Sequence, residues 1–119
     1  VTVPETPETQ GMFNFGQFQL MKDSAFFINI GRGATVELDD LVVALRDGQI
    51  AGAGLDVYQI EPLPSTHPLW KLPGVLLTPH VAGEGPYLEE RRTDLFIENC
   101  KRFNAGLPLK NLVDKVNWY

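Results

Sequence analysis

Only one cysteine occurs in the 119-residue sequence, and a single thiol excludes an internal disulfide. A reducing compartment is the natural setting for such a chain, so we expect a cytoplasmic protein. The thiol, Cys100, lies in a helical pattern with no basic neighbour before Lys101. This environment favours a buried structural thiol over a nucleophile.

Long apolar segments and an excess of cations are also absent. No apolar run reaches the length of a membrane span, and residues 1–11 lack the basic start and long apolar middle of a signal peptide. Ten Lys and Arg against fifteen Asp and Glu give a net charge of −5. The sequence therefore predicts no membrane partner and no nucleic-acid partner, and it predicts no metal site.

What the sequence does contain is an alternation of strand-like runs and helix-like patterns. The predicted strands are 1–3, 25–30, 50–57 and 75–77, and the predicted helices are 15–21, 37–47 and 86–104, with a single turn at 67–72. The apolar run 25–30 suits a strand buried on both faces, and Gly48 is expected to end the second helix. This alternation predicts an α/β fold with a parallel sheet. The G-x-G-x-x-G phosphate turn of nucleotide-binding sheets is missing.

Polar side chains follow three of the predicted strands. Arg32, between two glycines, follows the strand 25–30; Asp56 and Glu61 follow the next strand, and His80 follows the last. Because the carboxyl ends of parallel strands meet at one edge of a sheet, we expect these side chains to share one cleft. The alternative is structural: Arg32 braces a surface turn, His80 packs behind Pro79, and Glu61 is solvated.

The chemistry of these groups is complementary. A histidine exchanges protons near neutral pH, and a neighbouring carboxylate favours its protonated form, which is a competent general acid. An arginine holds a carboxylate with two parallel hydrogen bonds and polarises a neighbouring carbonyl. Together they suit reduction of a 2-oxo acid or oxidation of a 2-hydroxy acid. Because no side chain donates a hydride, a redox cofactor must supply it.

Five segments in register carry a family resemblance. They are Asn29-Ile-Gly-Arg-Gly-Ala-Thr-Val36, Gly52-Ala-Gly-Leu-Asp-Val57, Glu61-Pro-Leu-Pro64, His67-Pro-Leu69 and Leu77-Thr-Pro-His-Val-Ala-Gly83. Over residues 1–111 the chain resembles the NAD(P)-dependent D-2-hydroxyacid dehydrogenases, which include glyoxylate/hydroxypyruvate reductases and phosphoglycerate dehydrogenases. The intervals from Arg32 to Glu61 and from Glu61 to His80 are similar to those of the family.

The resemblance implies an oxidoreductase that moves a hydride between NAD or NADP and a small 2-oxo or 2-hydroxy acid such as glyoxylate or hydroxypyruvate. By the same resemblance, Arg32 anchors the substrate carboxylate and keto oxygen, His80 is the acid/base, and Glu61 pairs with His80. Asp56 matches the aspartate that hydrogen-bonds the nicotinamide carboxamide. The other residues implied to line the cofactor are Val3, Pro4, Thr9, Ile30, Gly31, Arg32, His80, Ala82 and Gly83.

The resemblance also implies the second half of a doubly wound, Rossmann-like parallel sheet with flanking helices, incomplete as it stands. Residues 1–105 then form the C-terminal half of a dinucleotide-binding domain, and residues 106–119 form a tail that returns to the substrate domain. The family's phosphate turn and the residue that selects NAD or NADP would precede Val1. We therefore expect this chain to be inactive in isolation. The resemblance further implies that the complete protein is a homodimer.

Two alternatives belong to other functional classes. One is an NAD(H)-sensing co-repressor on the same fold, in which the histidine loop resembles His-Ala-Ala-Trp; this chain has His80-Val-Ala-Gly83. The other is a short, non-catalytic interaction protein that packs its exposed sheet edge against a partner. The segment Gly83-Glu84-Gly85-Pro86 departs from the family's usual small residues and threonine, which leaves substrate shape near that loop open.

Overall fold

The computed structural model describes residues 1–117 of the chain. The chain divides into two compact units, Val1–Ala82 and Gly83–Tyr119. Residue 105, after which the sequence predicts a boundary, directly follows the helix of the second unit, which ends at Asn104. The assignment of 1–105 and 106–119 to parts of a larger protein stays a prediction, and the last two residues of that tail lie outside the described range.

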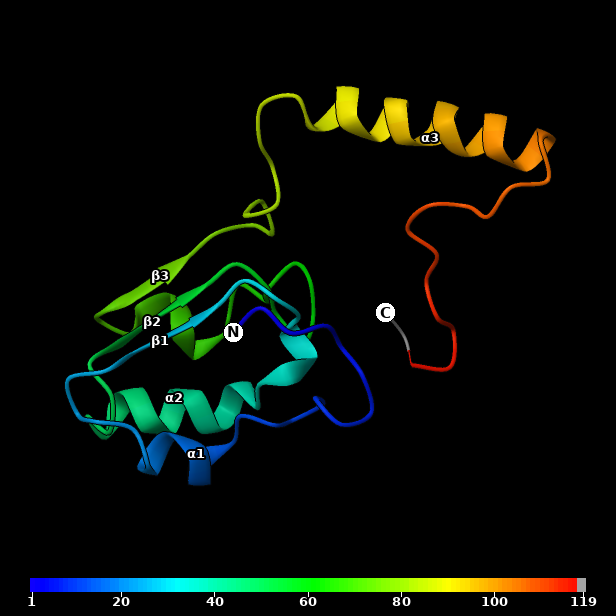
Figure 1. Ribbon diagram of the computed structural model, residues 1–119. Coiled ribbons are helices and arrows are strands. Elements are labelled where there is room, and N and C mark those ends of the chain that lie inside the picture. The colour runs from blue at the N-terminus through cyan, green and yellow to red at the C-terminus, as the bar shows by residue number, and fades with distance from the viewer. Residues whose placement is uncertain (118–119) are drawn as a thin grey trace. The chain divides into compact units, whose positions relative to one another are not determined.

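The first unit is built on a parallel sheet of three strands in the order β1-β2-β3, visible in Figure 1. They are β1 (Phe26–Asn29), β2 (Gly52–Leu55) and β3 (Val75–Leu77). Asn29 pairs with Leu55, and Leu55 pairs with Leu77, so the three strands end side by side. The predicted parallel α/β fold is confirmed, and the three strand ends lie at one edge of the sheet.

The predicted strand at residues 1–3 is not formed. Its contact with β1 consists of two backbone hydrogen bonds of Val1: its nitrogen donates to the Ile28 carbonyl, and its carbonyl accepts from the Ile30 N–H. These two bonds are the only backbone hydrogen bonds between the described residues 1–3 and β1, which is too little for a strand. The segment is nevertheless fixed against the end of β1.

Helices α1 (Phe15–Gln19) and α2 (Leu38–Arg46) lie together on one face of the sheet (Figure 1). Asn14 starts α1 with a capping box, because its side chain accepts from the Gly16 N–H while Gln17 accepts from the Asn14 N–H. Acidic residues occupy the first turn of α2 and Arg46 its last turn, as the helix dipole favours. Gly48 ends the helix with φ +67°, as predicted.

The core lies between these helices and the sheet. Phe27 of β1 stacks edge-on against Phe18 of α1, with ring centroids 5.2 Å apart. The other core side chains are apolar residues of the strands, of α2 and of the loops between them: Val36, Leu38, Leu41, Val42, Ala44, Ile50, Ala53, Leu55, Tyr58, Leu63 and Leu69. This packing fixes the sheet edge from which the polar side chains project.

The expectation that β1 is buried on both faces is wrong for the described residues. Phe27 and Asn29 are buried, whereas Phe26 and Ile28 are 62% and 56% exposed. Both helices of the unit lie on the other face, so alternate residues of the strand lack cover. Leu76 is also exposed; it pairs with Gly54, which in turn pairs with Ile28, so the three residues form one row across the sheet.

Two 3₁₀ turns and a long helix complete the structure. The turns are η1 (Gly33–Thr35) and η2 (Pro68–Lys71), and the helix of the second unit is α3 (Leu88–Asn104). Cys100 is exposed on α3, so the expected buried thiol is wrong; α3 has no buried residue at all. None of the helices within residues 1–117 combines the length and the apolar composition of a membrane span.

Candidate active site

Arg32 sits in the turn that directly follows β1 and caps the start of η1. Its side chain is exposed, and its Nη1 donates to the Gly31 carbonyl at 2.8 Å. Within residues 1–117 no ion pair involves Arg32, because none of the carboxylates lies within salt-bridge distance. The remaining guanidinium donors therefore face solvent and can bind an anion.

The two glycines around Arg32 are required by close approach of other backbone segments. A Cβ on Gly33 would collide with the carbonyl group of Tyr58, and one on Gly31 would lie 2.8 Å from the Val3 carbonyl oxygen. The Arg32 turn thus packs directly on the loop that leads to Glu61 and on the segment 1–3. Only glycine permits both contacts.

His80 and Glu61 form an ion pair on the same side of the molecule. The imidazole Nδ1 lies 2.8 Å from Glu61 Oε2, and the two side chains are 45% and 36% exposed. Glu61 Oε1 accepts a second hydrogen bond from the Tyr58 N–H at 3.0 Å. The hydrogen bonds from His80 and Tyr58 lower the pKa of Glu61, against the smaller effect of desolvation. Glu61 is therefore a fixed carboxylate that holds the imidazole by Nδ1.

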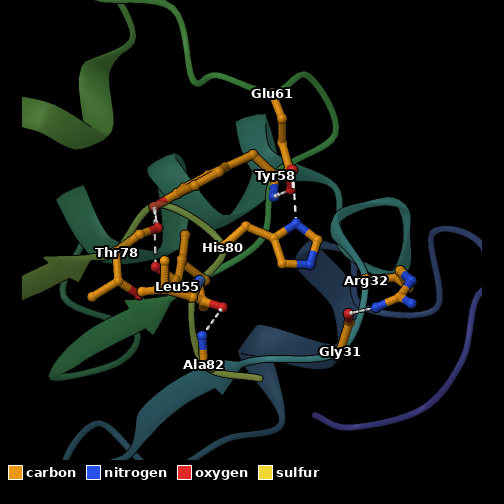
Figure 2. A network of polar contacts seen from close by, with 10 residues as sticks. Gly31, Arg32, Leu55, Tyr58, Glu61, Thr78, His80 and Ala82 are labelled. Carbon is orange, nitrogen blue, oxygen red and sulfur yellow. Dashed lines mark hydrogen bonds and ion pairs between the residues drawn. The ribbon is translucent and has the colours of Figure 1, made fainter. Parts of the chain in front are cut away.

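This pairing determines which ring nitrogen is free. Because Nδ1 faces a carboxylate, it carries the proton of that hydrogen bond, and Nε2 is left to exchange a proton with another molecule. In Figure 2 the imidazole lies between Glu61 and the turn of Gly31 and Arg32. The structure thus brings the predicted cation, carboxylate and imidazole to one edge of the sheet.

His80 has a left-handed backbone conformation, with φ +58°. This conformation is uncommon for a residue with a Cβ and persists only where neighbouring contacts hold it. The contacts come from Asp56, whose Oδ1 accepts from the Val81 N–H and whose Oδ2 accepts from the Ala82 N–H, both at 2.8 Å. Thr78, which precedes His80 in the chain, donates its hydroxyl to Asp56 Oδ1. Asp56 therefore holds the turn that presents the imidazole.

Asp56 is itself 2% exposed and ionised. Burial alone raises its pKa, but the hydrogen bonds from Thr78, Ala82 and Val81, together with the positive charge of His80, lower the pKa below its ordinary value. A carboxylate offers about four acceptor positions, and three are occupied here. One acceptor position of Asp56 thus remains for a further donor.

Tyr58 connects the two carboxylate-bearing segments. Besides its N–H bond to Glu61, its hydroxyl lies 3.0 Å from the Leu55 carbonyl and 2.9 Å from the Thr78 carbonyl (Figure 2). Burial and the charge of Asp56 raise the pKa of the Tyr58 hydroxyl, which stays a donor. A largely apolar cavity of about 580 Å³ lies beside it, lined by Tyr58, Glu61, Pro62, Leu63, Trp70, Leu77, Thr78, Pro79 and His80. Arg32 does not line this cavity.

The predicted cofactor-side residues fall into three groups. Val3 lies against Gly31, and Ile30, which is 49% exposed, adds an apolar surface next to them. Ala82 is tied to Asp56, whereas Gly83 begins the second unit. Thr9 uses its side chain within its own loop, where the oxygen accepts from the Thr6 N–H and lies 2.8 Å from the Pro4 carbonyl. An apolar wall and a carboxylate with a free acceptor position fit the flat ring and carboxamide of a nicotinamide.

Sequence reasoning missed four residues that shape this site, namely Asn29, Thr35, Tyr58 and Thr78. Asn29 and Thr35 are both completely buried and bind the carbonyl of Arg32. One signal was present: an amide at the end of an otherwise apolar strand must find partners, and the nearest polar groups are those of the following turn. Nothing comparable in the sequence indicated Tyr58 or Thr78.

An open parallel α/β sheet that gathers a cation, a carboxylate and an imidazole beyond its strand ends has the arrangement in which such sheets bind ligands. The class that fits this fold is a Rossmann-like nucleotide-binding domain, as comparison with known proteins shows. The chain belongs to the D-isomer specific 2-hydroxyacid dehydrogenase family: residues 1–82 match the model of its NAD binding domain. The match ends at the boundary between the two compact units.

Named relatives and solved structures agree with this assignment. The chain is 39% identical over 117 residues to glyoxylate/hydroxypyruvate reductase A of Escherichia fergusonii, covering 98% of this chain and 37% of the relative. A D-isomer specific 2-hydroxyacid dehydrogenase from Xanthobacter autotrophicus Py2, solved in complex with NADPH and MES, superimposes with a TM-score of 0.92 at 41% identity, over 100% of this chain and 48% of that one.

An NADPH-dependent glyoxylate/hydroxypyruvate reductase from Sinorhizobium meliloti, solved in complex with NADP and sulfate, gives a TM-score of 0.90 at 36% identity. That match covers 99% of this chain and 38% of the reductase. The chain therefore spans less than half the length of these relatives.

Proposed function

We propose that the protein containing these residues transfers a hydride between NAD or NADP and a small 2-oxo or 2-hydroxy acid, such as glyoxylate or hydroxypyruvate. The observation that carries the proposal is the His80–Glu61 pair at 2.8 Å on the sheet edge that also bears the solvent-facing Arg32. The relatives named as glyoxylate/hydroxypyruvate reductases support the substrate class.

In this proposal the nicotinamide cofactor, when bound, supplies or accepts the hydride at C2 of the acid. The guanidinium of Arg32 binds the substrate carboxylate and polarises the keto oxygen. His80 donates its Nε2 proton to that oxygen as the carbonyl is reduced, and takes it back when the hydroxyl is oxidised. Glu61 stays ionised and stabilises the imidazolium by accepting from Nδ1. Ile30, Gly31, Val3 and Asp56 would hold the nicotinamide.

The test uses the full-length protein with each cofactor and with glyoxylate and hydroxypyruvate, followed by the absorbance of the reduced nicotinamide. His80→Ala and Arg32→Ala should each lower kcat/KM by about 10²- to 10⁴-fold, since each removes a group that acts on the reacting atoms. His67→Asn, which retains an acceptor at the start of η2, and Arg46→Ala are the matched controls and should remain close to wild type. Near-normal turnover in His80→Ala would reject the assignment.

The assembly and location of the whole protein are further proposals. We expect a homodimer, as the family resemblance implies, and a place in the reducing cytoplasm, as the single cysteine suggests. Light scattering on the full-length protein at several concentrations measures the oligomeric state. A monomer at all concentrations would reject the dimer and leave the proposed chemistry unaffected.

A further inference from the structure

Asn29 is the last residue of β1 and is 0% exposed. Its Oδ1 accepts from the Gly31 N–H at 3.0 Å, and its Nδ2 donates to the Arg32 carbonyl at 3.1 Å and to Thr35 Oγ1 at 3.2 Å. A buried amide so fully bonded is costly to leave unpaired, so the turn has little freedom to rearrange while Asn29 is present.

Thr35, at the end of η1 and also 0% exposed, holds the same carbonyl from the other side. Its hydroxyl donates to the Arg32 carbonyl at 2.7 Å, and its N–H donates to it at 3.2 Å. One carbonyl oxygen thus accepts from Asn29 and twice from Thr35. The backbone of Arg32 is the centre of this network, although the Arg32 side chain itself is exposed.

The network also reaches the neighbouring strand. The main-chain carbonyl of Asn29 accepts from the Asp56 N–H at 3.0 Å, which extends the pairing of β1 with β2 up to the carboxylate that holds the His80 turn. A buried polar side chain therefore holds each turn: Asn29 holds the turn of Arg32, and Asp56 holds the turn of His80. The backbones of Asn29 and Asp56 are hydrogen-bonded to each other.

We propose that Asn29 and Thr35 are positioning residues, which fix the Arg32 turn so that the guanidinium meets the carboxylate and keto oxygen of the substrate. The inference rests on the proposed function, because it needs Arg32 to bind the acid. Its physical basis is that a long exposed side chain reaches a defined place only if its Cα–Cβ direction is fixed.

Thr35→Val tests this in the full-length enzyme, because valine has nearly the shape of threonine but lacks the hydroxyl. We expect kcat/KM for the 2-oxo acid to fall about 10- to 100-fold, with a larger rise in the KM for the acid than in the KM for the reduced cofactor. Thr35→Ser restores the hydroxyl and should remain within about threefold of wild type. Equal behaviour of the valine and serine variants would overturn the inference.

The decisive readout is coupling to Arg32. In an Arg32→Lys background the planar guanidinium is gone, so Thr35→Val should cost far less than it does in the wild type. An equal loss in both backgrounds means that Thr35 supports the fold in general, and it overturns the positioning role. If Arg32→Lys alone leaves kcat/KM unchanged, the proposed role of Arg32 fails, and this inference fails with it.

Asn29→Ser provides the second variant should Thr35→Val not fold. It removes the amide that binds both Arg32 and Thr35 and is expected to show the same loss, the same raised KM for the acid and the same coupling to Arg32→Lys. Activity at the wild-type level in a folded Asn29→Ser enzyme, checked by its urea midpoint, would overturn the proposal by itself.

Discussion

Glu61 shows how one residue can be tuned by its two hydrogen bonds. Its Oε2 faces His80, and its Oε1 accepts from the Tyr58 N–H, so the carboxylate is held at both oxygens and its pKa is lowered. It stays ionised throughout the neutral range and does not compete with His80 for the transferred proton. The charge of Glu61 and the proton exchange of His80 are thereby kept separate.

Glu61→Gln removes the charge and keeps the shape. The neutral amide stabilises the imidazolium less than a carboxylate does, so the alkaline limb of the rate profile for 2-oxo acid reduction should move to lower pH, with a smaller effect on the maximal rate. The measurement is kcat/KM against pH in the full-length enzyme. Glu90→Gln, which removes the same charge from an exposed position on α3, is the matched control. A profile that does not move would refute the role of Glu61.

Asp56 gives a prediction about stability. Its pKa in the folded protein is lowered from 3.8, so the unfolded state binds more protons as the pH falls. The ionised Asp56 carboxylate thus contributes fully to the free energy of unfolding above the pKa that it has in the unfolded chain. This contribution is lost as the pH falls through the lower pKa that it has in the folded protein. Asp56→Asn should cost about 1–3 kcal/mol at pH 7, because the amide nitrogen cannot accept from the surrounding donors. Urea titrations should show this difference shrinking in acid.

The shared position of Arg32, Glu61 and His80 was predictable from the sequence, whereas most of the hydrogen bonds that hold their turns were not. Arg32, Glu61 and His80 each follow a predicted strand, so the parallel topology alone indicated that they lie at one edge. The roles of Asn29, Thr35, Tyr58 and Thr78 depend on hydrogen bonds within turns. Those bonds are set by backbone angles, such as φ +58° at His80, that no periodicity in the sequence encodes.

At the scale of elements, η1 and the loop after β2 pack with no side chain between them. Gly33 makes this possible, because its Cα lies against the backbone of Tyr58. Gly33→Ala should therefore separate the Arg32 turn from the Glu61 loop, lower stability by about 1–3 kcal/mol and reduce kcat/KM. Gly85→Ala is the matched control, because a Cβ there meets nothing within 4 Å and the residue has no positive φ.

Equal stability and activity of the two alanine variants would contradict the close contact. The two measurements also separate two effects of the contact: the urea midpoint reports how η1 packs on the loop, and the KM for the acid reports the position of Arg32.

A periodic pattern predicted α2 to within a few residues, and a short apolar run predicted β3. The predictions failed where the outcome depends on neighbours. Residues 1–3 have the composition of a strand but make only the two bonds of Val1, and the run 25–30 is apolar on both faces although only one is covered in the described structure. Cover of a strand is a property of the surrounding elements rather than of its own sequence.

At the scale of the whole molecule, the chain spans 37% of the E. fergusonii relative and 38% of the S. meliloti structure. One face of its sheet carries Phe26, Ile28 and Leu76 in exposed positions, with only Gly52 and Gly54 between them. Contiguous apolar surface of this kind is uncommon on a soluble monomer and promotes association. We propose that other parts of the full-length protein cover this face.

Because of this exposed face, the 119-residue chain produced alone should bind a hydrophobic dye such as ANS more strongly, per mole, than the full-length protein. It should also lack turnover, because it has no G-x-G-x-x-G phosphate turn. Phe26→Ser with Ile28→Thr should reduce the dye signal of the isolated chain, because it removes the exposed side chains and leaves the buried Phe27 in place. Val43→Ser, an exposed change on α2, which covers the other face of the sheet, serves as the control. Steady-state oxidation of NADH or NADPH by the purified chain with glyoxylate or hydroxypyruvate would refute the expectation of inactivity. It would mean instead that these residues by themselves bind both cofactor and acid.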